Sequence, residues 1–285
     1  MIRTMVTAAN TMGQIQQELD IIGHNVANVN THGYKAEQVS FQEMLYQQFR
    51  NDKGDTQAPR QSPLGIRYGV GAMMGHSKVN WKQGALQTTD RTLDFVLKEP
   101  KQYFNIQTTN EQAGGRNVYD IVLTRKGNFY AQPENDGTML LVNEEGHPVL
   151  ALGDQQIRFD EDFQSLSVKD GGELQIQFSD GRIESHQLQI TRVDRPDLMK
   201  RLPSGNLTIP DNFDALGFPV GEVMTDLVTP EERGVIGIQQ GALEMSNVRL
   251  EKELTELINT QRSYQMNART VTLADQMLGI INNVR

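Results

Sequence analysis

The sequence predicts an α+β protein in which N- and C-terminal helices pair as a coiled coil, with a central, mostly antiparallel all-β domain between them. Three observations predict this class. Apolar residues recur with helical spacing at the start of the chain, they recur in a heptad register at its end, and turn residues divide the middle into short segments. We expect an N-terminal helix and joint at 1–40, an extended, flexible connecting segment at 41–84, the β domain at 85–234 and the C-terminal coiled-coil helix at 235–285.

The first helix is indicated by apolar residues at steps of three and four. They are Ile2, Met5, Ala9, Met12, Ile15, Leu19, Ile22 and Val26. This spacing places them on one face of a helix. A stripe of this kind is stable only when another element covers it, so we expect it to meet the C-terminal helix.

The helix gives way to HNVANVNTHGYKA, residues 24–36, which is rich in residues that end helices. Asn and Gly adopt left-handed backbone conformations more readily than other residues, and Asn also binds its own backbone in turns. The segment therefore predicts a shaped joint whose polar groups can also meet a neighbouring subunit. Its candidate residues, with their apolar anchors, are Asn25, Asn28, Asn30, Thr31, Gly33, Tyr34 and Phe41.

The middle of the chain predicts strands. The connecting stretch NDKGDTQAPRQSPLG, residues 51–65, is polar and contains Pro and Gly, which favours an extended or mobile segment. After it, segments with alternating or β-branched residues are separated by Gly, Asn and Asp, as expected for successive antiparallel hairpins. The turns are expected at Lys126-Gly127-Asn128, Asn135-Asp136-Gly137, Glu145-Gly146, Asp170-Gly171-Gly172 and Asp180-Gly181.

The last helix shows a heptad register, with Gly241 or Ser246 marking its start. The seam positions are Leu243, Asn247, Leu250, Leu254, Leu257, Gln261, Tyr264, Ala268, Val271, Asp275 and Leu278. Polar seam residues weaken a coiled coil but fix its register and partner. A second apolar row predicts that the helix is covered on more than one side; its members are Ile258, Met266, Leu273, Met277, Ile280 and Ile281.

Composition excludes several classes of protein. Of 285 residues, 37% are hydrophobic and 6% aromatic, which predicts a thin core or several small ones. A net charge of −9 without a basic cluster disfavours binding to nucleic acid or to an anionic membrane. The absence of cysteine excludes disulfides and thiolate sites. No apolar run is long enough for a membrane span, and the N-terminus lacks the apolar stretch of a cleaved secretory signal.

No motif predicts catalysis, a cofactor or a metal. GVGAMMG at 69–75 lacks the spacing of a dinucleotide loop, and Asp160-Glu161-Asp162 lacks the pattern of a calcium loop. The five histidines show no ligand spacing, and no nucleophile elbow is present. We therefore predict no catalytic residues, no cofactor and no metal ligands.

The two ends resemble the signatures of the bacterial flagellar rod and hook proteins. NVANVNTHGYKAEQVSF is similar to the N-terminal pattern A-N-x-x-T-x-G-Y-K/R followed by Phe, through Ala27, Asn28, Thr31, Gly33, Tyr34, Lys35 and Phe41. The segment from Gln240 resembles the C-terminal signature. Its matching residues are Gly241, Leu243, Glu244, Ser246, Asn247, Val248, Glu253, Leu257, Ile258, Gln261, Arg262, Tyr264, Asn267, Asp275, Met277 and Leu278.

Two central segments, 83–97 and 123–150, are also similar to this family, and the single modest β insert resembles a rod protein more than a hook protein. Proximal and distal rod types both stay open. The chain departs from the family where a G-D/N-G-F-F turn is usual. Here it carries Lys98, Glu99 and Pro100, so we expect the strand pairing near 95–106 to differ from the usual hairpin.

The resemblance implies a structural subunit of the flagellar basal-body rod. Such proteins pass unfolded through the flagellar type III export apparatus and polymerise through their terminal helices into a hollow axial drive shaft with other rod and hook subunits. Besides the joint, the residues expected to carry polymerisation are Leu243, Ser246, Asn247, Leu250, Leu254, Leu257, Gln261, Tyr264, Val271 and Leu278. The alternatives are a hook-type protein, an assembly scaffold or cap, and a wall-modifying enzyme.

Overall fold

The computed structural model describes residues 2–44, 46–49, 66–69, 71–112, 116–134, 136–202, 205–210, 213 and 217–283. The predicted loop at 51–65 lies outside them. The chain divides into two compact units. The helical unit consists of Met1–Ala27, Glu37–Val79 and Arg249–Arg285, and the β unit consists of Asn28–Ala36 and Asn80–Val248.

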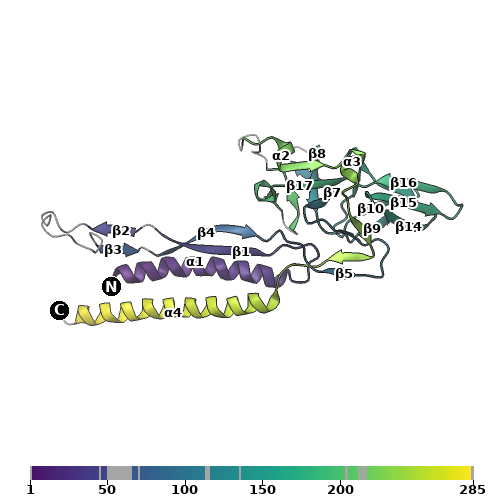
Figure 1. Cartoon of the computed structure of the whole chain (residues 1–285). Coiled ribbons are helices and arrows are strands. Elements are labelled where there is room, and N and C mark those ends of the chain that lie inside the picture. The colour runs from purple at the N-terminus through teal and green to yellow at the C-terminus, as the bar shows by residue number, and fades with distance from the viewer. Residues whose placement is uncertain are drawn as a thin grey trace. The chain divides into compact units, whose positions relative to one another are not determined.

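In the helical unit, two long helices run antiparallel, side by side (Figure 1). They are α1 (Ile2–Ala27) and α4 (Leu250–Asn283). The 34 residues of α4 give it a length of about 51 Å. Ala8, Ile15 and Ile22 of α1 are buried at seven-residue intervals, and the predicted N-terminal helix is confirmed. Of its predicted apolar stripe, Ile15 and Ile22 are buried, whereas Ile2 and Ala9 are exposed.

A long two-stranded ribbon contacts α1 in the same unit. It contains β1 (Glu37–Glu43), β2 (Tyr46–Phe49), β3 (Ile66–Gly69) and β4 (Ala72–Val79). β1 pairs antiparallel with β4, and β2 pairs antiparallel with β3. The register shifts between Val39 and Phe41, where a Cβ on Gly75 would lie 2.9 Å from the Ser40 carbonyl oxygen. Glycine therefore permits the close approach of the two backbones at this bulge.

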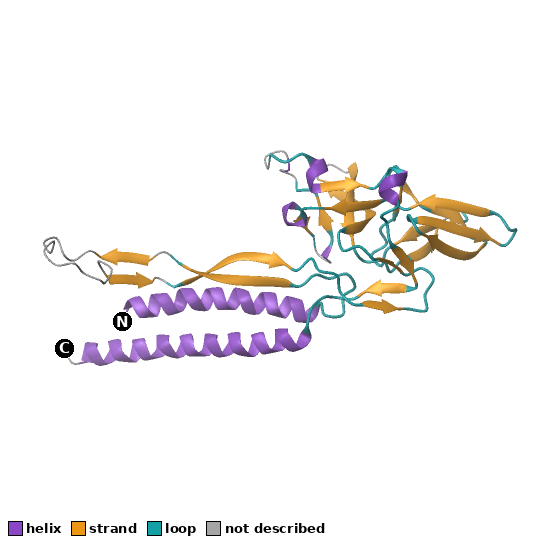
Figure 2. Cartoon of the chain, in the orientation of Figure 1, coloured by secondary structure: helices purple, strands orange, loops and turns teal. Residues whose placement is uncertain are grey.

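Strands dominate the β unit (Figure 2). Its strands are β5 (Leu86–Thr88), β6 (Phe95–Leu97), β7 (Gln102–Gln112), β8 (Arg116–Thr124), β9 (Tyr130–Pro133), β10 (Thr138–Val142), β11 (Leu150–Ala151), β12 (Gln155–Gln156), β13 (Arg158–Asp160), β14 (Phe163–Lys169), β15 (Glu173–Phe178), β16 (Ile183–Gln187), β17 (Ile190–Val193), β18 (Lys200–Arg201), β19 (Leu207–Thr208), β20 (Met224–Asp226), β21 (Ile238–Gln240) and β22 (Ala242–Glu244). The short helices are η1 (Pro196–Leu198), α2 (Val220–Val223) and α3 (Pro230–Arg233).

The ladders between these strands are antiparallel, which confirms the predicted β class. The largest sheet has the order β18-β19-β8-β7-β17-β20, and a three-stranded sheet has the order β14-β15-β16. The main core contains Phe95, Phe104 and Phe129, with ring centroids 5.8 and 5.2 Å from Phe129. A second cluster contains Tyr103 and Leu123, and the single Trp, Trp81, packs against it.

Several strand pairings in the β unit join segments that are far apart in the sequence. β6 pairs with β21, and β5 pairs with β22, so the segment 238–244 is built into strands near residues 86–97. β7 pairs with β8 on one edge and with β17 on the other. The region 95–106 therefore forms two strands in separate sheets rather than one hairpin, with the Lys98–Pro100 turn between them.

The C-terminal helix begins later than its heptad pattern predicts. Leu243 lies in β22, and Ser246 and Asn247 lie in the following loop, so the first two seam positions are not helical. Gly241 has φ +67° and separates β21 from β22, and it does not mark the start of the helix. The pairing of β22 with β5 holds this segment extended, which overrides its helical spacing.

Candidate functional site

The N-terminal and C-terminal signature segments meet in both units, and Asn25 makes this connection in the helical unit. Its side chain is 1% exposed. The amide Nδ2 donates to the Glu37 carbonyl oxygen at 2.7 Å and to Glu253 Oε2 at 3.0 Å, and Oδ1 accepts from the Glu37 amide at 3.0 Å. One buried amide thus links α1, β1 and α4.

The joint itself belongs to the β unit, where residues 28–36 form a compact turn. Thr31 donates from its amide to the Asn28 carbonyl oxygen at 3.2 Å and from its hydroxyl to Asn28 Oδ1 at 3.1 Å. Asn30 is exposed on this turn. These contacts confirm that the Asn-rich segment is a turn at the end of the helix.

Gly33 is the residue that lets the turn lie against Arg125 and Lys126, which follow β8. Its φ is +68°, and a Cβ there would lie 3.0 Å from Cβ and 3.1 Å from the carbonyl carbon of Arg125. Its amide donates to the Glu244 carbonyl oxygen at 2.8 Å. A side chain at this position would separate the two signature segments, because both the backbone conformation and the space require glycine.

A buried ion-pair triad lies beneath the joint. The Glu244 carboxylate accepts from Lys35 Nζ through Oε1 and from Arg125 Nε through Oε2, the latter at 2.9 Å. Arg125 Nη1 also donates to the Gln102 carbonyl oxygen at 2.6 Å, and Lys35 Nζ donates to the Lys82 carbonyl oxygen at 2.9 Å. All three side chains are almost fully buried. The triad joins three parts of the sequence that are far apart.

The pKa values in this triad reflect burial and charge together. Burial by itself raises the pKa of Glu244, but the Arg125 and Lys35 charges and their hydrogen bonds outweigh it and leave that pKa below its ordinary value. Burial lowers the pKa of Lys35, against the opposing charge of Glu244. The carboxylate is therefore held ionised between its two cations.

Asn247 and Tyr34 complete this contact. Asn247 Oδ1 accepts from the Ala36 amide at 2.7 Å, and Nδ2 donates to the carbonyl oxygens of Asn80 and Lys82 at 2.7 and 2.8 Å. Tyr34 is buried against Val248, and the Arg201 guanidinium lies 5.3 Å from the centre of its ring. Ser246 Oγ accepts from the Val248 amide at 3.3 Å. Asn247 thus acts as a cross-link between the signatures rather than as a residue of a helical seam.

The remaining predicted residues lie on the helical unit. Leu257, Tyr264, Val271 and Leu278 of α4 are half-buried, whereas Leu250, Leu254 and Gln261 are exposed. Phe41 in β1 is also largely exposed. The buried α4 side chains are Glu253, Thr260 and Ala274, which are polar or small. The face that α4 turns toward α1 is therefore shifted by one residue from the predicted seam at every second position.

Arg125 and Glu253 are functional candidates that sequence reasoning did not select. Arg125 follows β8 in the LTRKGN segment, and Glu253 lies within the C-terminal signature. From the sequence, an arginine in a turn-rich segment is expected to be exposed to solvent. Its partner in the ion pair, Glu244, is 119 residues away in the sequence. The ion pair between Arg125 and Glu244 cannot be predicted without knowing that β22 pairs with β5.

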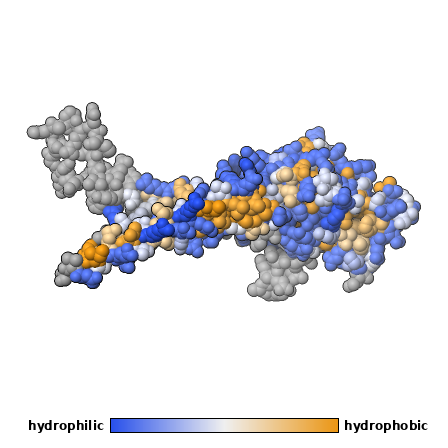
Figure 3. All heavy atoms as spheres, turned by 90° about the horizontal axis from the view of Figure 1, so that it is seen from below, coloured by the Kyte–Doolittle hydropathy of each residue, from blue (hydrophilic) through white to orange (hydrophobic). Residues whose placement is uncertain are grey.

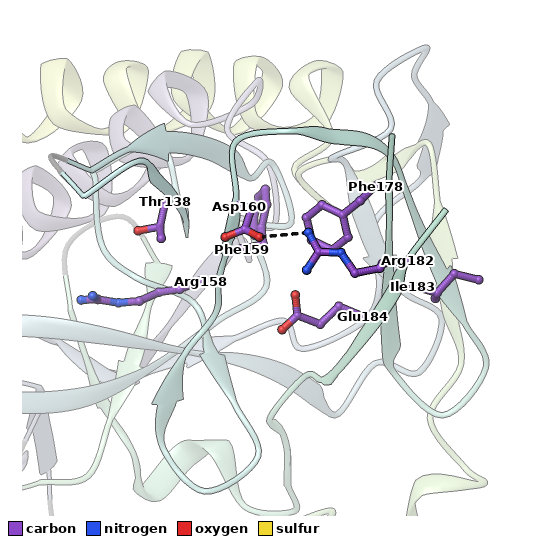
Figure 4. Close-up of a pocket in the computed structure, with 8 residues that line it drawn as sticks. All are labelled: Thr138, Arg158, Phe159, Asp160, Phe178, Arg182, Ile183 and Glu184. Carbon is purple, nitrogen blue, oxygen red and sulfur yellow. Dashed lines mark ion pairs between the residues drawn. The ribbon is translucent and has the colours of Figure 1, made fainter. Parts of the chain in front are cut away.

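A pocket of about 430 Å³ lies in the β unit (Figure 4). Its lining residues are Thr138, Arg158, Phe159, Asp160, Phe178, Arg182, Ile183 and Glu184. Arg182 Nη2 lies 3.6 Å from Asp160 Oδ2, and Arg158 Nη1 lies 3.2 Å from Glu134 Oε2. Both arginines are therefore paired with carboxylates, and the pocket carries no concentrated charge for a ligand.

The second pocket, of about 290 Å³, lies between α1, β1 and α4 of the helical unit and is lined by Glu18, Glu37, Glu253 and Glu256 among others. Burial and the Glu256 charge raise the pKa of Glu18, against a hydrogen bond with Thr260. Among the described residues, no group of His, Asp and Glu is arranged to hold a metal ion. Within the same residues, no helix has the length and apolarity needed to cross a membrane.

Comparison with known proteins gives matches at both ends of the chain and along its length. Residues 5–35 match the family described as flagella basal body rod protein, and residues 239–284 match the flagellar basal body rod FlgEFG protein C-terminal family. The chain is 38% identical to the flagellar hook-basal body complex protein FlhP of Bacillus subtilis and 31% identical to the flagellar basal-body rod protein FlgG of the same organism. Each match covers 100% of both chains.

A further relative, the flagellar basal-body rod protein FlgG of Borreliella burgdorferi, is 29% identical over 100% of this chain and 99% of its own. The residues matched at the two ends include Gly33 and Lys35 of the joint, Glu244, Asn247 and all of α4. The chain therefore belongs to the flagellar basal-body rod protein family, the structural proteins of the rod in the basal body of the bacterial flagellum.

Proposed function

We propose that this chain polymerises, with copies of itself and with other rod and hook subunits, into the hollow axial shaft of the flagellar rod. The terminal helices α1 and α4 provide the polymerising surface, and the β unit provides the outer part of the subunit. The observation that carries this proposal is the exposed apolar surface of α4. Its most exposed members are Leu250, Leu254, Ile258, Met266, Leu273, Met277, Ile280 and Ile281.

A water-soluble helix normally buries its apolar side. Here α4 buries Glu253, Thr260 and Ala274 and half-buries Leu257, Val271 and Leu278, but many of its large apolar side chains stay exposed. In the helical unit, Glu18 of α1 and Glu256 of α4 also repel one another. The exposed apolar surface and this repulsion support the proposal that α1 and α4 form a stable coiled coil only inside the polymer, where neighbouring subunits cover the remaining apolar surface.

We propose that α1 and α4 supply the inner coiled-coil domain and that the β unit forms the outer domain. The expected boundary near residue 235 moves to the start of α4 at Leu250, because residues 238–244 form β21 and β22 of the β unit. We further propose that the chain passes unfolded through the flagellar type III export apparatus and acts without catalysis. The β unit fits this order of events, because its closure needs the segment 238–244 near the end of the chain.

The joint has a specific part in this proposal. The Gly33 turn, the Glu244 triad and the Asn247 cross-link fix the two signature segments to each other within the β unit. We propose that polymerisation needs this link between the two signature segments.

Truncation tests the proposal at a boundary that the structure defines. A chain ending at Val248 keeps Glu244 and Asn247 but lacks α4. We expect it to give a soluble, folded β unit that does not appear in purified basal bodies, whereas the full chain does. Rods that incorporate the truncated chain at the full-chain level would refute assembly through the terminal helices.

A further inference from the structure

The outer face of α4 carries a second heptad row that α1 does not cover. Its members are Met266, Thr270, Leu273, Met277 and Ile280, which we call the α4 outer stripe. All five are exposed, with exposed fractions of 62, 54, 47 and 63% for Met266, Leu273, Met277 and Ile280. Figure 3, which views the molecule from the side of α4, shows hydrophobic surface near the C-terminal end of this helix. The spacing is that of a helix-docking surface.

The outer face of α1 differs from that of α4 because it contains several glycine and alanine residues. Residues at alternating steps of four and three are all exposed, and we call them the α1 outer stripe: Ile2, Val6, Ala9, Gly13, Gln16, Asp20, Gly23 and Ala27. Four of the eight are Gly or Ala. A Cβ added to Gly13 or Gly23 would meet nothing within 4 Å. Small residues at helical spacing form a shallow groove into which a bulky row can pack, and they let two helix axes approach to about 8 Å.

The two stripes match in length. The α4 outer stripe runs from Met266 to Ile280, and the matching part of the α1 outer stripe runs from Ala9 to Gly23. Each covers about four helical turns, or about 21 Å. This part of α1 is small at Ala9, Gly13 and Gly23 and polar at Gln16 and Asp20, so the large apolar row of α4 has space at both of its ends.

A pair of opposite charges favours one register for the contact between the α4 outer stripe and the α1 outer stripe. When the stripes are laid antiparallel with Met266 opposite Gly23, Ile280 falls opposite Ala9, and Arg269 falls opposite Asp20. Arg269 and Asp20 are both exposed, and neither takes part in an ion pair within the described residues. Because α1 and α4 are antiparallel within one copy, two copies in the same orientation also bring α4 of one antiparallel to α1 of the other.

We propose that the α4 outer stripe of one copy docks antiparallel onto the α1 outer stripe of a second copy in this register. The inference rests on the proposed function and names the surfaces and the partner that it requires. The contact joins two different faces, so a pair of copies keeps one free α1 outer stripe and one free α4 outer stripe. Such a heterologous contact repeats from copy to copy and builds an open helical array when its rotation does not close a ring.

A disulfide tests the register directly, because the chain contains no cysteine. Gly23→Cys and Met266→Cys are introduced together into the full chain, and basal bodies purified from the cells are oxidised. Within one copy Asn25 contacts Glu253, so Gly23 and Met266 of the same copy lie more than two helical turns apart along α4. We expect a ladder of covalent multiples of this chain.

The matched control pairs Gly23→Cys with Gly279→Cys. Gly279 is an exposed helical glycine of α4 with nothing within 4 Å of an added Cβ, and it lies off the α4 outer stripe. We expect no ladder from this pair. Absence of the ladder from the first pair, a ladder of equal strength from the control, or a crosslink to a protein of another mass would each overturn the proposed docking.

A second variant, Gly13→Leu, fills the groove without harming the isolated chain. Leucine has the higher helix propensity, and the added side chain has open space around it. We expect unchanged or higher helical content by circular dichroism, with at least a tenfold loss of the chain from basal bodies, whereas Gly279→Leu is incorporated normally. Equal incorporation of Gly13→Leu would overturn the docking while leaving the chain a rod subunit; absence of the unaltered chain from basal bodies would overturn the proposed function itself.

Discussion

The carboxylate of Glu244 is the single group on which the contact between the two signature segments most depends. It is buried with Lys35 and Arg125 and also accepts from the Gly84 amide at 3.1 Å. Removing one member of a buried charge network leaves the others uncompensated, which destabilises more than the network contributes when intact. Sequence reasoning did not reach this triad, since nothing in the local pattern relates residue 35 or 125 to residue 244.

Glu244→Gln is expected to lower the free energy of unfolding of the β unit by about 3–5 kcal/mol. The measurement is urea unfolding of the full chain followed by the fluorescence of Trp81, whose indole donates to Asp197 at 2.9 Å within the β unit. Glu251→Gln, an exposed carboxylate of α4, serves as the control and is expected to change the free energy by less than about 0.5 kcal/mol. Equal effects of the two variants would contradict the role of the triad.

The same carboxylate gives the β unit a dependence on pH. The pKa of Glu244 is lower in the folded chain than in the unfolded chain, where the pKa of a Glu is about 4.3. Its contribution is therefore fully present above that ordinary value and is lost as the pH falls through the lower folded pKa. We expect the stability difference between the unaltered chain and Glu244→Gln to shrink when unfolding is measured at successively lower pH. A difference that grows on acidification would show the opposite sign.

Gly127 is a second residue whose importance is steric. A Cβ there would lie 1.7 Å from the carbonyl oxygen and 2.8 Å from the carbonyl carbon of Phe95, whose amide donates to the Gly127 carbonyl oxygen at 2.9 Å. Gly127→Ala must displace β6, and we expect a loss of about 1–3 kcal/mol in the same unfolding measurement. Gly221→Ala, where the added Cβ meets nothing within 4 Å, is the control.

At the scale of elements, the spacing of apolar residues correctly predicts that both long helices exist. It does not predict where each helix begins and ends or which face is buried. Ile15 and Ile22 belong to the predicted stripe and are buried. The α4 heptads extend in sequence back to Leu243, yet strand pairing holds that residue in β22. Because apolar residues occupy more than one side of α4, their spacing could not select which side faces α1, and Glu253 and Thr260 are buried instead of Leu254 and Gln261.

Asn25→Ala tests how the helices are connected. The substitution leaves the amide and carbonyl of Glu37 and the carboxylate of Glu253 without their partner. Unpaired buried groups of this kind cost about 1–3 kcal/mol each, and more when charged. We expect faster amide hydrogen exchange throughout α1 and α4 in purified basal bodies, with no change in the β unit. Asn259→Ala, at an exposed position of α4, should leave exchange unchanged; the idea fails if both variants behave alike.

At the scale of the whole molecule, turn chemistry predicted the antiparallel β class correctly, whereas the order of strands was not accessible from the sequence. Hairpins such as β7–β8 and β14–β15 join neighbouring segments and follow from local turns. The pairings β6–β21 and β5–β22 join segments about 140–160 residues apart, and no local signal specifies them. These long-range pairings hold the segment 238–244 within the β unit.

The central claim concerns the whole chain: α1 and α4 are completed by other subunits and not by each other. Hydrogen exchange of the dilute isolated chain, compared with the same chain in purified basal bodies, measures this directly. We predict that amides of α1 and α4 exchange rapidly in the isolated chain and slowly in basal bodies, while those of the β unit are protected in both. Equal, strong protection of α4 in the dilute isolated chain would contradict the claim.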